Sequence, residues 1–174
     1  MPIQAVLQVV GYKNSGKTTL MCELIRQLGS DGFTVGTVKH DRHRLELDQE
    51  GKDSWQHREA GAEVVAVVSE QANRTFLVEE RALALDELLR RLPSVDVVLV
   101  EGFKLEKYPK LVLIREREQL PLLEMVTGAI LVVTWLPVEE VRPYAKDVQV
   151  LSIHDKEQVL RAAAAAVACQ LGRS

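Results

Sequence analysis

Short apolar runs alternate along this chain with segments whose apolar residues recur at helical spacing. Ile3 to Val10 is a continuous, mostly apolar run rich in valine. The segment behind it repeats apolar side chains every three or four positions, at Leu20, Met21, Leu24, Ile25 and Leu28. The first pattern is typical of a buried strand and the second of an amphipathic helix. The chain therefore begins with a predicted strand, a connecting loop and a helix that the Gly29 to Gly32 segment ends.

The same alternation continues to the last residues. We predict further strands over 33–38, 64–68, 75–78, 96–100, 111–114, 129–133 and 148–151. Helices are predicted over 52–60, 82–92 and 155–171, and 137–144 is either a loop or a short helix. Continuous apolar strands are buried on both faces, and repeated strand–helix units place helices on both sides of a parallel sheet. The sequence thus predicts a single α/β domain, 1–174, with a mostly parallel sheet between two helical layers.

The loop between the first strand and helix carries a phosphate-binding pattern. It fits G-x-x-x-x-G-K-[ST] at every fixed position with Gly11, Tyr12, Lys13, Asn14, Ser15, Gly16, Lys17 and Thr18. Backbone N–H groups and the helix N-terminus together form a nest for phosphate. Lys17 would reach the β- and γ-phosphates, and the Thr18 hydroxyl would coordinate Mg²⁺. A chance glycine-rich turn is the alternative, but the order of strand, loop and helix favours a three-layer P-loop NTPase fold.

Two charged segments follow predicted strands. Lys39-His40-Asp41-Arg42-His43 comes after the second strand, and Val100-Glu101-Gly102-Phe103-Lys104 ends another. Ligands of open α/β sheets bind beyond the carboxyl ends of the strands, so Asp41 and Glu101 are candidate Mg²⁺ residues. A solvated charged loop is the alternative for Asp41. A zinc site of His40, His43 and His57 is a weaker hypothesis, because no suitably spaced cysteines accompany them.

Composition narrows the function classes. The 174 residues are 47% hydrophobic and 27% charged, as in an ordinary globular protein. A net charge of −3 argues against a general nucleic-acid surface. No apolar run has membrane-spanning length and no signal peptide is apparent, so we expect a cytoplasmic protein. The two cysteines, Cys22 and Cys169, fall in predicted helices and are expected to be buried thiols in a reducing compartment.

Together, four blocks resemble the molybdopterin-guanine dinucleotide biosynthesis protein B family, MobB. They are Gly11–Thr19, Lys39–His43, the Asp48…Gly51-Lys52-Asp53-Ser54…Arg58…Ala60-Gly61-Ala62 segment and Val100–Lys104, and they extend to about residue 115. The resemblance implies a homodimeric GTP-binding protein with weak GTPase activity. Such a protein assists the guanylyltransferase that attaches GMP to molybdopterin. Carried over, Gly11 to Thr19 would bind phosphate, Lys17, Asp41 and Glu101 would be catalytic, and Thr18, Asp41 and Glu101 would hold Mg²⁺.

Several alternatives stay open from the residues alone. The guanine-reading Asn-Lys-x-Asp motif is absent, so GTP rests on the resemblance; Trp135 after a late strand can stack on a base or simply pack. Related dimeric nucleotidases carry a lysine where this chain has Tyr12, which makes lysine catalysis across a dimer doubtful. A small-molecule kinase would need a lid, for which Arg42, Arg44 and Arg58 are candidates. A nucleotide-gated metallochaperone would use the histidines.

Overall fold

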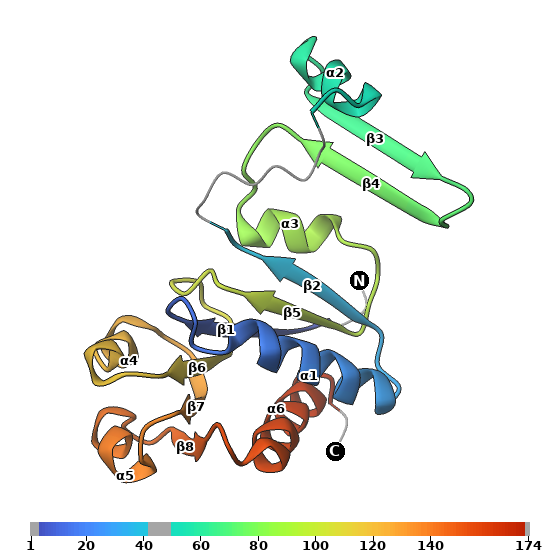
Figure 1. Ribbon diagram of the computed structural model, residues 1–174. Coiled ribbons are helices and arrows are strands. Elements are labelled where there is room, and N and C mark those ends of the chain that lie inside the picture. The colour runs from blue at the N-terminus through green and yellow to red at the C-terminus, as the bar shows by residue number, and fades with distance from the viewer. Residues whose placement is uncertain (1–3, 42–49, 173–174) are drawn as a thin grey trace. The chain divides into compact units, whose positions relative to one another are not determined.

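The computed structural model describes residues 4–41 and 50–172. They form two compact units (Figure 1), which we describe separately. The first contains the residues up to His40 together with those from Leu89 onward, and the second runs from Asp41 to Leu88. Arg42, His43, Arg44 and Asp48 lie outside the described residues.

The first unit contains a parallel sheet of six strands. Their order is β2-β5-β1-β6-β7-β8, and every neighbouring pair is parallel. The strands are β1 (Ala5–Gly11), β2 (Val35–Lys39), β5 (Val97–Glu101), β6 (Lys110–Ile114), β7 (Ala129–Thr134) and β8 (Gln149–Ser152). Each contains a run that the sequence predicts as a strand. The predicted α/β class with a mostly parallel sheet is confirmed.

Helices pack on both faces of this sheet. The long helices α1 (Lys17–Ser30) and α6 (Lys156–Gln170) contribute to one core with Leu111 and Leu113 of β6. The short helices α4 (Leu122–Met125) and α5 (Val138–Val141) contribute to the opposite core with Val112 and Ile114. Successive side chains of a strand point to opposite faces, which is why a continuous apolar run feeds two cores.

The structure differs from the predictions in two local features, whereas 137–144, predicted as a loop or a short helix, contains α5 and η2 (Arg142–Tyr144). No helix is predicted between 115 and 128, where η1 (Arg117–Gln119) and α4 each form a single short turn of helix. The expectation of buried cysteines is wrong, because Cys22 and Cys169 are both free and exposed. Cys22 falls between the buried positions Met21 and Leu24 of α1, on the side of the helix that faces away from the core.

The second unit contains an antiparallel hairpin. Strands β3 (Val64–Ser69) and β4 (Arg74–Glu79) pair from Val64 opposite Glu79 to Ser69 opposite Arg74. Helix α2 (Asp53–Glu59) contacts β3, and α3 (Leu85–Arg91) leads back to the first unit. Both strands are predicted from the sequence, but they form a separate two-stranded sheet. Only four residues join them, which suits a hairpin and not a parallel crossover.

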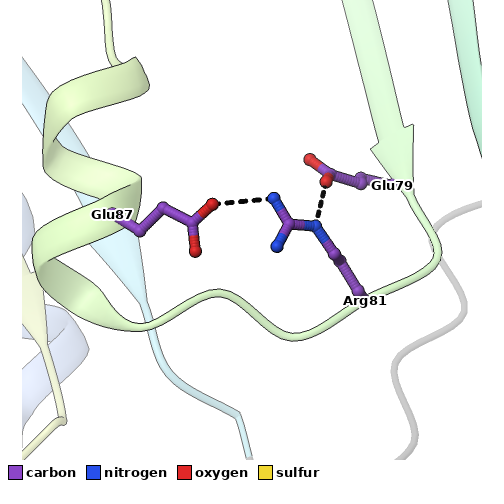
Figure 2. A network of polar contacts seen from close by, with 3 residues as sticks. All are labelled: Glu79, Arg81 and Glu87. Atoms are coloured by element: carbon purple, nitrogen blue, oxygen red, sulfur yellow. Dashed lines mark hydrogen bonds and ion pairs between the residues drawn. The ribbon is translucent and has the colours of Figure 1, made fainter.

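Arg81 links the end of the hairpin to α3. Its guanidinium bonds the carboxylate of Glu79, the last residue of β4 (Figure 2). A second nitrogen of the same group lies 2.7 Å from an oxygen of Glu87 on α3. One planar side chain with several donors can bond two carboxylates in this way. The network therefore fixes the course of the chain as it leaves β4.

Candidate functional site

The loop between β1 and α1 has the backbone geometry that a phosphate nest requires. Asn14 and Gly16 both adopt left-handed conformations, with φ values of 61° and 97°. A side chain at Gly11 would force its neighbours to shift, because a Cβ atom would lie 2.7 Å from Ser15 Oγ and 3.0 Å from Leu113 O. Helix α1 begins at Lys17 without a side-chain cap and without an acidic residue in its first turn. The positive end of the helix is therefore left for an anion.

Two donors converge on one carbonyl inside the loop. Lys17 Nζ donates to Tyr12 O at 2.6 Å, and Ser15 N donates to the same oxygen at 3.3 Å. Partial burial lowers the pKa of Lys17; Glu101 opposes this shift and Lys39 adds to it. The ammonium and the amide thus face the interior of the turn, where an oxyanion would compete for both.

Glu101 and Thr18 meet across two neighbouring strands. β5 pairs with β1, which sets Glu101 opposite Val9 and so beside the loop that follows β1. Thr18 Oγ1 lies 3.3 Å from each carboxylate oxygen of Glu101. The structure therefore brings together two of the three residues that the sequence predicts for Mg²⁺. A hydroxyl and a carboxylate are hard oxygen ligands that suit this ion.

The segment after Glu101 is held by a buried amide. Gln8, in the middle of β1, donates from Nε2 to the carbonyl oxygens of Gly102 and Phe103 at 2.9 and 2.8 Å. On the other side His40 N donates to Glu101 O at 2.9 Å, and the His40 and Phe103 rings stack at 4.3 Å. These contacts fix the peptide that carries the Glu101 carboxylate.

The structure describes fewer contacts for the other residues that the sequence predicts for the site. Asp41 is exposed and is the first residue of the second unit, so its Mg²⁺ role stays a prediction. Within 4–41 and 50–172, no three histidine, cysteine or acidic side chains gather closely enough to hold a metal ion. His57 lies on α2, and His43 falls outside these ranges, so the zinc hypothesis stays untested. Of the candidate lid arginines only Arg58 is described, and it pairs with Glu80 at 3.2 Å.

A pocket of about 500 Å³ opens beside the loop. Its walls come from the loop and the start of α1, and from the ends of β6 and β7: Asn14, Gly16, Lys17, Thr18, Thr19, Arg115 and Trp135. Arg115 NH1 donates to Asn14 O at 2.5 Å, and Trp135 Nε1 donates to Ser15 O at 2.9 Å. The indole N–H thus bonds the loop; base stacking by Trp135 stays a prediction.

Arg115 is a pocket residue that is not among the residues predicted from the sequence. Its guanidinium carbon lies 5.3 Å from the centre of the Trp135 ring, within range of a cation–π contact. The signal was present, because Arg115 directly follows the fully apolar end of β6 and so comes at the carboxyl edge of the sheet. Of the predicted loop residues, Lys13 is exposed and the Tyr12 ring lies 5.4 Å from Lys104 Nζ.

These residues suit a polyphosphate with a divalent cation. Ser15 Oγ is buried and has no hydrogen-bond partner among the described residues, so it is a polar group available at the base of the loop. Lys17 would hold phosphate oxygens, and Thr18 with Glu101 would hold the ion or its water shell. None of the described helices has the length and apolar character needed to cross a membrane.

Several known proteins that are similar to this chain carry the same family name. A Haemophilus influenzae molybdopterin-guanine dinucleotide biosynthesis adapter protein is 37% identical over 136 residues, covering 77% of this chain and 76% of that protein. The Escherichia coli adapter protein is 39% identical over 115 residues, 64% of this chain and 66% of that protein. The crystal structure of Bacillus subtilis MobB has a TM-score of 0.74 at 30% identity, covering 93% of this chain and 97% of that one.

The similarity also covers the residues that form the pocket. The model of the family described as molybdopterin guanine dinucleotide synthesis protein B matches residues 6–135, from β1 to Trp135. This match spans most of the chain and includes the phosphate loop, Glu101 and Arg115. The chain belongs to the MobB family, and its α/β fold is that of the solved MobB structures.

Proposed function

We propose that this protein binds GTP with Mg²⁺ and assists the attachment of GMP to molybdopterin as an adapter to a guanylyltransferase. The observation that carries the nucleotide part is the loop itself. Its left-handed residues, the uncapped start of α1 and the inward Lys17 ammonium together form a donor set that suits phosphate oxygens. The contact between Thr18 and Glu101 supports a Mg²⁺ site beside those phosphates.

The choice of GTP and the place in the pathway rest on family membership. The relatives from Haemophilus influenzae and Escherichia coli carry the name of adapter proteins in molybdopterin-guanine dinucleotide biosynthesis. An adapter needs a partner, and a guanylyltransferase together with molybdopterin is the set that fits the pathway named for these relatives. The alternatives of a small-molecule kinase and a metallochaperone gain no support from the described contacts.

We expect slow hydrolysis by the protein alone. A fast hydrolase needs a group that orients water and a further cation on the γ-phosphate, which is worth about 10³–10⁵ in rate. The glutamine beside the site, Gln8, is buried and engaged with the Gly102 and Phe103 carbonyl oxygens. Nucleotide binding would then act mainly as a switch for contact with a partner.

The hairpin supports the proposed homodimer. Val68 and Leu77 are 68% and 67% exposed, and Phe76, on the other face of the hairpin, is 57% exposed. A two-stranded sheet has two faces and two edges to cover, and it is marginally stable when isolated. Apolar exposure on both faces marks an interaction surface, and we assign it to a second copy of the chain.

Calorimetric titration of the purified protein with GTP and Mg²⁺ tests the nucleotide proposal. Lys17→Ala should lose most of the affinity, because it removes the point charge on the β- and γ-phosphates. Lys156→Ala is the matched control, since it removes the same charge from α6, where Lys156 pairs with Glu23 and does not line the pocket. Equal affinity of Lys17→Ala and the parent would reject the loop as the site. Titrations with ATP, CTP and UTP decide the preference for guanine.

Steady-state turnover of the same preparation tests the adapter role. We expect slow GTP hydrolysis that changes when the guanylyltransferase and molybdopterin are added. Turnover by the isolated protein above about 1 s⁻¹, an ordinary enzyme rate, would instead indicate a stand-alone nucleotide-driven enzyme.

A further inference from the structure

Two side chains from neighbouring strand ends bond consecutive carbonyls of the phosphate loop. Arg115, after β6, donates to Asn14 O at 2.5 Å. Trp135, after β7, donates from its indole nitrogen to Ser15 O at 2.9 Å. Trp135 N in turn donates to Ile114 O at 2.9 Å, so Arg115 and Trp135 directly follow the paired ends of two adjacent parallel strands.

These bonds determine which way the following amides point. In a planar trans peptide the C=O of one residue and the N–H of the next point in opposite directions. With the Asn14 carbonyl turned toward Arg115, the Ser15 N–H must turn away from it, and it donates to Tyr12 O inside the loop. With the Ser15 carbonyl turned toward Trp135, the Gly16 N–H is turned away in the same manner.

Close packing around the Trp135 ring supports these hydrogen bonds. Trp135 ring atoms are the nearest neighbours that a Cβ at Gly16 would meet, at 3.6 and 3.8 Å. The Arg115 guanidinium lies over the indole, and the His154 ring meets its edge with centroids 5.5 Å apart. The indole is therefore held in one orientation relative to the loop, with its N–H aimed at Ser15 O.

We propose that Trp135 and Arg115 are positioning residues of the phosphate site, which hold two successive loop peptides so that their amides face a bound phosphate. This inference rests on the proposed nucleotide binding and names residues that act through the loop backbone. It assigns the pair a task that is independent of the base. Pyrophosphate, which has no base, should depend on Trp135 and Arg115 as strongly as GTP does.

Substitutions that preserve the aromatic ring or the positive charge distinguish this positioning role from direct contact with the base. Trp135→Phe retains an aromatic face but loses the N–H donor. Arg115→Met loses every donor, whereas Arg115→Lys retains a positively charged group that can donate. Loss of one hydrogen bond corresponds to a three- to ten-fold loss of affinity, about 0.6–1.4 kcal/mol. Trp55→Phe on α2 and Arg117→Gln on η1 are the matched controls, because neither residue lines the pocket.

The experiment is calorimetric titration of the full chain with Mg²⁺-GTP and with inorganic pyrophosphate. We expect Trp135→Phe and Arg115→Met to lose three- to ten-fold in affinity for both ligands, Arg115→Lys to recover part of the loss, and both controls to match the parent. Melting temperatures near that of the parent would exclude general unfolding as the cause. Unchanged affinities, or a loss confined to GTP, would overturn the proposal; the latter would make Trp135 a base-contacting residue.

A second measurement keeps the two proposals distinct. In ¹⁵N-labelled protein without nucleotide, Trp135→Phe should shift the Gly16 amide resonance and speed its exchange with solvent, whereas Trp55→Phe should not. If the parent fails to bind GTP but this shift occurs, the proposed function fails and the positioning role stands. If the Gly16 amide is unchanged, the positioning role fails even where GTP binds.

Discussion

Strands β3 and β5 have nearly the same apolar composition and opposite surroundings. β5 reads Val-Val-Leu-Val-Glu, and its first four residues are fully buried between β2 and β1. β3 reads Val-Val-Ala-Val-Val-Ser and pairs with β4, and its Val64 and Val68 are 53% and 68% exposed. An apolar run therefore predicts a strand in both cases, but neighbours decide whether the strand is buried.

The apolar side chains of the two strands therefore stabilise different things, namely the folded core and a contact with another surface. In the first unit, helices on both faces of the sheet remove the strands from water. The hairpin of the second unit keeps large side chains on its surface, which favours association with another surface. Substitutions in the two strand sets should therefore act on different properties, namely unfolding in one and assembly in the other.

The largest effect is expected for Leu99→Ala in β5. Leu99 is fully buried within the core shared with α1 and α6. Truncating such a leucine removes buried area and leaves a cavity, at a cost of about 2–5 kcal/mol. Urea unfolding, with the free energy extrapolated to water, measures this loss.

Leu77→Ala in β4 is the matched control for that measurement. The same truncation at an exposed site should change the unfolding free energy of the first unit by less than about 0.5 kcal/mol. If Leu77→Ala cost as much as Leu99→Ala, exposure in the isolated chain would be the wrong guide to which strands carry the stability.

A second effect should appear in assembly. Leu77→Lys places a charge on the exposed face of the hairpin, and Val68→Lys does the same on the neighbouring strand. If this face joins two copies, either substitution should shift a dimer to monomer while the melting of the first unit is unchanged, because a buried unpaired charge is costly. Sedimentation velocity over a range of concentrations measures the change. A monomeric parent protein would contradict the homodimer proposal.

A third effect is expected at the glutamates that end β5 and β4. Glu101→Gln at the end of β5 should weaken the Mg²⁺-dependent part of GTP binding by about ten-fold or more, since it removes a charge while preserving size. Glu79→Gln at the end of β4 is the control, because Glu79 bonds Arg81. Titrations with Mg²⁺ and with EDTA separate the two parts. Identical Mg²⁺ titrations for Glu101→Gln and the parent would move the metal role to Asp41.

Much of the first unit follows from sequence pattern, whereas the separate sheet of the second unit does not. Buried parallel strands and amphipathic helices each leave a periodic signal, and these elements were predicted close to their observed bounds. The short connection between β3 and β4 indicates a hairpin, but the pattern of apolar residues does not show that this hairpin forms a sheet of its own. The single turns η1 and α4 are too short to show a helical period.

The residues of the candidate site also differ in how far they can be predicted from the sequence. Lys17, Thr18 and Glu101 could be found because a motif and a strand end place them together. Arg115 and Trp135 could not be assigned their contacts, because both bond backbone carbonyls of a loop about 100 residues away in the chain. Their partners carry no side-chain signal, and only the order of strands in the sheet brings them near.

Gln8 helps to set the register of β1 in the sheet. It is a fully buried polar residue in an otherwise apolar strand, and its amide nitrogen donates to the Gly102 and Phe103 carbonyls, its acceptors among the described residues. Sliding β1 by two residues would keep every valine on its proper face, but it would leave that amide without acceptors at a cost of about 1–3 kcal/mol. Apolar residues alone tolerate such an error. The hydrogen bonds of Gln8 therefore favour the observed register of β1. A sheet in which β1 is shifted in register, so that the phosphate loop no longer lies beside Glu101, is destabilised.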